Sequence, residues 1–304
     1  MYKHAIVPAT ASRVSYATVL VMPKSGTVSM QNFFIAYTKQ ILNMPDLEAY
    51  DWVAEQNAFN KISFRILHLS CPEFRKYVSA EDYARWESLE YSWGVQWEMQ
   101  EAYNRQPALE RLTPDHNIVF LFRNPLDQLI SNYHYAKALH EALDLEDFIF
   151  NKHGLDAYIK MFYSFHVVRQ THPNNFLFVT YEELMHDRQA TIRMMLKHLN
   201  IPYDAIAFNK ALDESSIDAF RKREDELRKE YPSLLHHARD GSVGQWQTVM
   251  SPELVQRIED RMQEFGLSLK MFRLTNDPIE PRFACLSEEI LQHNISEVVS
   301  AFRR

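Results

Sequence analysis

The chain has 304 residues, 46% of them hydrophobic, so it is long and apolar enough to bury the core of one enzyme-sized domain. Its formal net charge of -7 argues against nucleic acid or an anionic membrane as a partner, so any anion site has to be built locally. With two cysteines, no signal-peptide pattern and no apolar run of about 18 residues, the sequence predicts a cytoplasmic protein without a disulfide framework or membrane span.

Short apolar runs predict four buried β-strands, at residues 15–22, 62–67, 117–122 and 175–180. Helical patterns lie between them, with amphipathic helices expected at 28–42 and 126–143. This alternation predicts an α/β fold, a single domain with a central, mostly parallel sheet flanked by helices. Ligands are then expected at the carboxyl ends of the strands.

The first strand is followed by Pro23-Lys24-Ser25-Gly26-Thr27 and then by a helix, which is a P-loop-like strand-loop-helix. Backbone N–H groups of such a turn, together with the helix N-terminus, suit a phosphate. Lys24 adds the positive charge that an anionic leaving group needs. The alternative is an ordinary turn with a solvated lysine.

The third strand ends at Arg123-Asn124-Pro125, where Asn124 is expected to cap a helix and Pro125 to lie in its first turn. Arg123 and Ser131, two turns into that helix, are placed to hold one phosphate between them. An Arg123–Asp127 ion pair that only steadies the turn is the alternative. A third candidate, RDGSVGQW at 239–246, is a glycine-flanked arginine loop suited to clamping a phosphate.

These segments resemble the PAPS-dependent sulfotransferase family of the cytosolic type, in order, over about residues 19–272; PAPS is 3′-phosphoadenosine 5′-phosphosulfate. PKSGT is similar to its 5′-phosphosulfate loop, FRNPLDQLISNYHY at 122–135 to its 3′-phosphate strand and helix, and RDGSVGQW to its RKGxxGDW segment. The resemblance implies transfer of a sulfuryl group from PAPS, as co-substrate, to a hydroxyl or amine of a small-molecule acceptor, without a metal.

The resemblance also assigns roles to individual residues. Lys24 would contact the sulfuryl-bridging oxygen, and the 5′-phosphate would be bound by Ser25, Gly26 and Thr27. The 3′-phosphate would be bound by Arg123, Ser131, Arg239 and Gly241. Tyr181, at the end of the fourth strand, would contact adenine, although a tyrosine there is as often plain core packing.

Three positions depart from the family pattern. Ser29 stands where a tryptophan usually stacks on adenine, and Ile217 stands where a phenylalanine is expected. The base is therefore expected to rest on aliphatic groups or on Phe33. Asp240 replaces the lysine of RKG, which weakens 3′-phosphate binding if that position acts through its charge.

Sulfuryl transfer needs a base for the acceptor proton, and histidine suits neutral pH. His68 is the candidate among 13 histidines, because it ends the second strand-like run and matches the family's strand-end histidine. His116 precedes its strand, and His134 and His140 lie beyond the 3′-phosphate residues. A purely structural strand-end histidine is the alternative.

An aromatic stretch at 81–112, which holds Trp86, Trp93 and Trp97, predicts either an acceptor pocket or a helical face buried in the core. Motifs occupy about 15–273, and 274–304 is expected to form a helical extension that closes the core or meets a partner subunit, so a homodimer is left open.

A P-loop-type nucleotide kinase is the chief rival function, but its motif GxxxxGK[ST] is absent. The second rival is a catalytically inactive PAPS/PAP-binding protein.

Overall fold

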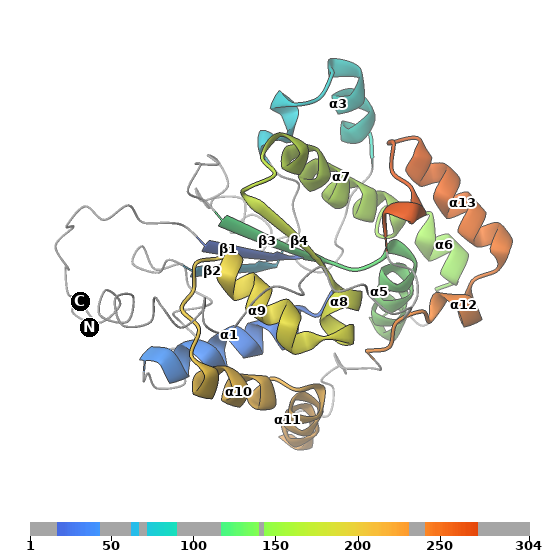
Figure 1. The fold of residues 1–304 in the computed structure, drawn as a ribbon. Helices are drawn as coiled ribbons and strands as arrows, with labels where there is room; N and C mark the ends of the chain where they lie inside the picture. Colours follow the sequence, from blue (N-terminus) through green and yellow to red (C-terminus); the bar gives the residue numbers. More distant parts are fainter. Residues whose placement is uncertain are drawn as a thin grey trace, which may run out of the picture.

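A parallel sheet of four strands, in the order β2-β1-β3-β4, forms the centre of the computed structural model (Figure 1). The structure describes residues 17–42, 62–66, 72–89, 117–139, 143–230 and 241–272. The strands are β1 (Ala17–Val21), β2 (Ile62–Ile66), β3 (Asn117–Phe122) and β4 (Phe176–Thr180). All four predicted strands and their parallel pairing are therefore confirmed.

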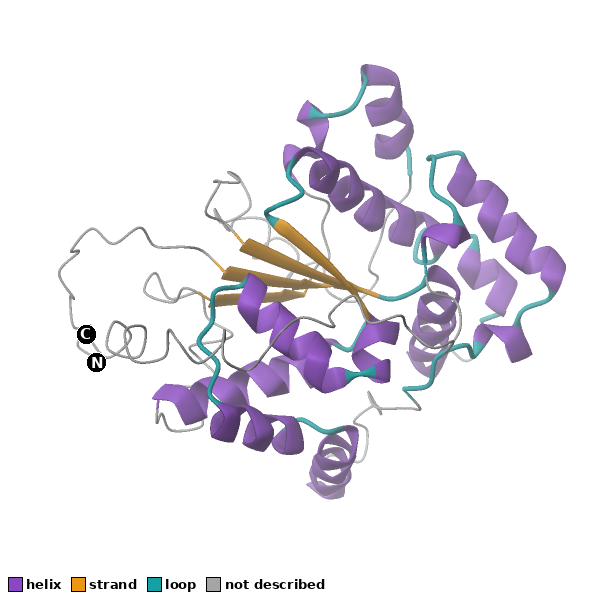
Figure 2. Cartoon of the chain, in the orientation of Figure 1, coloured by secondary structure: helices purple, strands orange, loops and turns teal. Residues whose placement is uncertain are grey.

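Helices cover both faces of this sheet, as Figure 2 shows. Over the described ranges they are α1 (Thr27–Leu42), η1 (Pro72–Lys76), α3 (Ala80–Glu87), α5 (Pro125–Leu139), α6 (Leu145–Ile149), α7 (Leu155–Thr171), α8 (Tyr181–His186), α9 (Arg188–His198), α10 (Ala205–Glu214), α11 (Ile217–Glu230), α12 (Trp246–Val249), α13 (Pro252–Gln263) and η3 (Leu269–Met271). The predicted helix at 28–42 is α1, and the one at 126–143 is α5, described to Leu139.

Alternate strand residues point to opposite faces and build two separate cores. On one face, Phe120 and Phe122 pack with residues of α5, α7 and α13. On the other face, Val119 and Leu121 pack with residues of α1, α9 and α10. The continuous apolar run of β3 follows directly from this burial on both sides.

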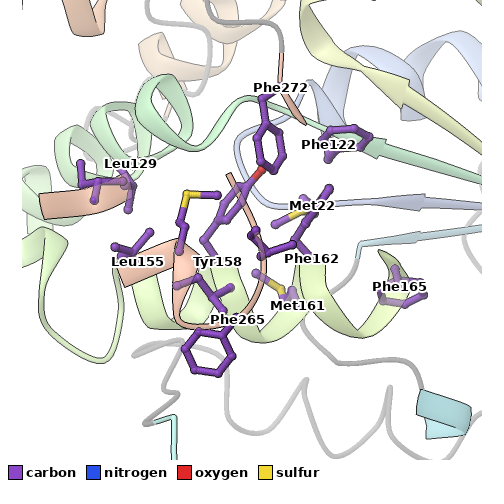
Figure 3. Packing of buried hydrophobic residues seen from close by; sticks show 14 of the residues in the cluster. Met22, Phe122, Leu129, Leu155, Tyr158, Met161, Phe162, Phe165, Phe265 and Phe272 are labelled. Atoms are coloured by element: carbon purple, nitrogen blue, oxygen red, sulfur yellow. The ribbon is translucent and has the colours of Figure 1, made fainter. Parts of the chain in front are cut away.

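Aromatic rings fill much of the first core (Figure 3). Phe162 of α7 lies 5.1 Å from the ring of Phe122 and 4.7 Å from that of Phe272, measured between centroids. Burying each such side chain contributes about 1.5–3 kcal/mol. This packing holds the end of β3, where the candidate site begins, against α7.

The strand order places a topological switch point between β1 and β3, because the chain leaves β1 toward β2 and then returns to the other side of β1. The loop after β1 and the residues after β3 therefore meet at one edge of the sheet. Asn124 caps α5 as predicted, since its Oδ1 accepts a hydrogen bond from the Asp127 N–H at 2.9 Å.

Candidate functional site

The loop after β1 has the backbone of an anion-binding turn. Lys24 has a φ of 61° and Gly26 a φ of 88°, both in the left-handed region. The N–H groups of this loop are therefore not oriented as in a regular strand or helix. A Cβ on Gly26 would lie 3.1 Å from the Tyr181 ring, and thus only glycine fits without a shift. Thr27 then starts α1, whose first turn leaves N–H groups without intrahelical partners.

Two side chains of α5 contact this loop. Gln128 is buried and donates to the Pro23 carbonyl at 3.4 Å, and the Lys24 Nζ lies 4.5 Å from the centre of the Tyr135 ring. Ser25 is fully buried, and its N–H donates to the Met22 carbonyl at 3.2 Å. The half-buried Lys24 is thus held at the carboxyl edge of the sheet.

Arg123, at the end of β3, is only 4% exposed and joins three segments. Its Nη2 donates to the Ser242 carbonyl at 2.6 Å, and its guanidinium lies 4.6 Å from the centre of the Tyr181 ring. Nη2 also lies 3.7 Å from Asp127 Oδ2, so the ion pair named as the alternative for Arg123 is present. The Arg123 Nε is buried without a hydrogen-bond partner in the described part of the chain.

The loop at 241–246 is fastened to this edge by Asp127 and Tyr181. The Asp127 carboxylate accepts from the Gly244 N–H at 2.7 Å and from the Trp246 N–H at 3.1 Å. The Tyr181 hydroxyl donates to the Gly241 carbonyl at 3.0 Å. Gly241 has a φ of 75°, and a Cβ there would lie 3.0 Å from Ile217. The loop therefore closes over Tyr181 from the α11 side.

Tyr181 consequently stands at the meeting point of all three predicted motifs. Its ring touches Gly26 of the first motif and lies under Arg123 of the second, and its hydroxyl holds Gly241 of the third. The capping box of Thr180 and Glu183 starts α8 at this residue. Core packing, the alternative for Tyr181, is also present, because only 8% of it is exposed.

Glu182 is a buried acid that sequence reasoning missed. Its Oε1 accepts from both the backbone N–H and the side-chain Nδ2 of Asn124, at 3.1 and 2.7 Å. Burial raises the pKa of the Glu182 carboxyl to about 7, although these bonds and Arg123 pull it downward. The Glu182 carboxyl thus contacts Asn124, the residue that follows Arg123 at the end of β3. Its position next to Tyr181 is the only sequence signal for it.

Arg188, the first residue of α9, is a second residue that the motifs did not reveal. Its Nη2 donates to Ser29 Oγ at 3.1 Å and to the carbonyl and Oγ of Ser215 at 2.9 and 2.7 Å. Ser29 lies in the first turn of α1, and Ser215 joins α10 to α11. Three elements therefore meet at one guanidinium beside the first motif.

Several sequence expectations have a different outcome or stay untested. Phe33 cannot support the base as predicted, because it is fully buried and its ring stacks on Tyr37 at 5.5 Å. Trp86 packs in the core against Phe74, at 5.0 Å between ring centres, so for this residue the core alternative is right. Ser131 is half-buried on α5. Some predicted positions lie outside the described residues, namely His68, His116, His140, Arg239, Asp240, Trp93, Trp97 and the extension at 274–304.

The fold and the site define an α/β protein with a P-loop-like strand-loop-helix at the carboxyl edge of a parallel sheet. A family model described as a sulfotransferase domain matches residues 17–273. The chain therefore belongs to the sulfotransferase family. No described helix combines the length and the hydropathy of a bilayer span.

Similar proteins include sulfotransferase 2B1 of Homo sapiens, 28% identical over 145 residues, which are 42% of this chain and 38% of that protein. The Rattus norvegicus protein of the same name is 29% identical over 167 residues, 49% of this chain and 48% of that protein. Both matches span less than half of the relative's length. Retinol dehydratase, solved with androsterone and the inactive cofactor PAP, has the same fold, with a TM-score of 0.51, 18% identity, and coverage of 87% of this chain and 83% of that one.

Proposed function

We propose that this protein is a sulfotransferase that moves a sulfuryl group from PAPS to a hydroxyl or amine of a small-molecule acceptor. The observation that carries the proposal is the convergence of three separate segments on Tyr181 in a chain of this family. The motif-bearing part, about 15–273, is proposed to act as a single domain.

The residues present fit a ligand with two phosphate groups. Arg123 keeps a buried Nε donor without a partner among the described residues, and Gly26 and Gly241 allow close approach of the backbone. We assign the 5′-phosphate to Ser25, Gly26 and Thr27. The 3′-phosphate falls to Arg123 and Gly241, together with Ser131 and Arg239.

In the proposed reaction the acceptor oxygen forms a bond to sulfur while the bond from sulfur to the 5′-phosphate oxygen breaks. Lys24 stabilises the charge that develops on the departing phosphate, because it is held at the edge where the loop binds that group. His68 takes the acceptor proton as general base. The other product is adenosine 3′,5′-bisphosphate (PAP).

The first acceptors to test are apolar alcohols. Two solved structures of the same fold are retinol dehydratase complexes, one with androsterone and one with retinol, both with PAP. As part of the proposal, we expect the present chain to accept apolar molecules of this kind, with a hydroxyl as the acceptor group.

The kinase alternative is disfavoured by Asp127. A kinase holds Mg²⁺ through acidic side chains near its strand ends. Here both carboxylate oxygens of Asp127 already accept hydrogen bonds from the 241–246 loop. This carboxylate therefore fastens the loop and is poorly placed to serve as a metal ligand.

The test is a transfer assay with sulfur-labelled PAPS, a panel of alcohols, phenols and amines, and parallel samples with EDTA. We expect labelled acceptor in amounts that chelation leaves unchanged. Label transfer that needs ATP and magnesium would establish a kinase, whereas saturable PAP binding without any labelled product would establish an inactive binding protein. Either result contradicts the proposal.

Lys24→Ala is expected to lower turnover about 100-fold or more, because it removes a charge aimed at the departing phosphate. Lys137→Ala is the matched control, since Lys137 also lies over a tyrosine ring of α5, that of Tyr133 at 5.4 Å. Its turnover should equal that of the unaltered protein. Equal losses in both variants would remove Lys24 from the mechanism.

A further inference from the structure

The Arg188 guanidinium makes its hydrogen bonds through one nitrogen. Its three hydrogen bonds within the described part of the chain leave from Nη2 and end on Ser29 and Ser215. The Nε is buried and has no partner within the described ranges, although a guanidinium offers five N–H donors. The guanidinium is thus held at one nitrogen, and its Nε remains unsatisfied by the described residues.

No carboxylate neutralises Arg188 among the described residues, and burial lowers its pKa. A desolvated guanidinium without an acidic partner is costly unless a ligand compensates it. Two kinds of ligand group do so, a phosphate or the face of an aromatic ring. The position of Arg188 decides between them.

Arg188 contacts α1 and the junction of α10 and α11, whereas Arg123 contacts α5 and the 241–246 loop. Ser29, its partner, is two residues beyond the loop that ends in Thr27, and Ser215 precedes Ile217, which faces Gly241. Tyr181 lies near enough to act electrostatically on Arg188. The groups proposed above to bind phosphate are Arg123 and the loop backbones, so the base is the part of the nucleotide that remains for Arg188.

Two of the neighbouring residues are small and one is aliphatic. Ser29 and Gly241 are small, and Ile217 is the aliphatic residue at the start of α11. Phe33, the aromatic residue expected here, is buried in the core instead. Among these residues, Arg188 offers the planar group on which a purine can stack.

We propose that Arg188 binds the purine base of the nucleotide, with its guanidinium plane held by Ser29 and Ser215 as the stacking platform. The inference rests on the proposed function, since it needs a purine nucleotide in this site. In this chain, Arg188 of α9 would thus stack on the base in place of the aromatic ring expected at position 29.

Calorimetric titration with two ligands tests the assignment, namely adenosine 3′,5′-bisphosphate and base-free ribose 3,5-bisphosphate. Arg188→Ala should weaken binding of the adenosine ligand about 5- to 100-fold and leave the base-free ligand within about twofold. Arg188→Lys, which keeps the charge and can still donate to both serines, should lose most of the same base-dependent affinity. Arg188→Ala combined with Ser29→Trp should regain it.

Arg193→Ala is the matched control, because Arg193 is on the same helix but lies over the rings of Tyr203 and Phe208 in the second core. It should lower the melting temperature without changing the ratio of the two affinities. An equal loss for both ligands in Arg188→Ala would make Arg188 a phosphate ligand, and no loss for either would make it a structural tie; both outcomes overturn the inference. Absence of binding by the unaltered protein would instead reject the proposed function.

Discussion

The phosphate side and the base side of the candidate site are built in different ways. On the proposed phosphate side, Arg123 and Asp127 bind backbone groups of the 241–246 loop, and Gly26 and Gly241 have positive φ. On the base side, Arg188 ties Ser29 to Ser215 by side-chain contacts between distant elements. Backbone turns require particular residues and are therefore recognisable as motifs in the sequence. A side chain that supports a base can be replaced by a side chain of different chemistry, so it leaves no motif.

The largest expected effect comes from the phosphate side. Arg123→Ala should weaken adenosine 3′,5′-bisphosphate and base-free ribose 3,5-bisphosphate alike, by about 100-fold or more, because it removes a buried charge-assisted donor. Arg169→Ala is the control, since that arginine lies over the Phe178 ring, 4.6 Å from its centre, and is not part of the site. A loss confined to the adenosine ligand would contradict the division into two sides.

Gly26→Ala should have the next largest effect, about a tenfold loss of affinity for either ligand, because the new Cβ pushes the loop away from Tyr181. Gly266→Ala separates this clash from backbone strain alone. Gly266 also has a positive φ, of 66°, but nothing lies within 4 Å of the added Cβ. The control should lower only the melting temperature; if it weakened binding as much, the close approach to Tyr181 would not matter.

The smallest expected effect is a pH dependence that comes from Glu182. Its pKa is about 7, so it is mostly protonated at pH 6 and mostly ionised at pH 8. An anion bound near Arg123 repels the ionised form, so binding takes up a proton and affinity falls as pH rises through 7. Relative to Glu182→Gln, which does not titrate, the unaltered protein should bind equally at pH 6 and a few-fold more weakly at pH 8.

Titrations at both pH values, with the two proteins in the same buffers, measure this difference and cancel the ionisation of the ligand itself. A constant affinity ratio between pH 6 and pH 8 would show that Glu182 does not sense the bound phosphate. Because Gln keeps an oxygen for the two Asn124 donors, the substitution leaves the cap of α5 in place.

Sequence reasoning succeeded where the signal is local. β3 was predicted to its end residues because a strand buried on both faces is a continuous apolar run, and Asn124 and Pro125 mark the start of α5 in the sequence. Glu182 and Arg188 were missed because their partners lie 58 and 159 positions away along the chain. Only folding reveals that Ser29 supports an arginine.

Calorimetric titration of the unaltered full chain with adenosine 3′,5′-bisphosphate tests the central claim most directly, that three separate segments form one site for a bisphosphorylated nucleotide. The account predicts one saturable site per chain, which Arg123→Ala abolishes in the same concentration range. An absence of binding heat up to millimolar ligand would contradict it.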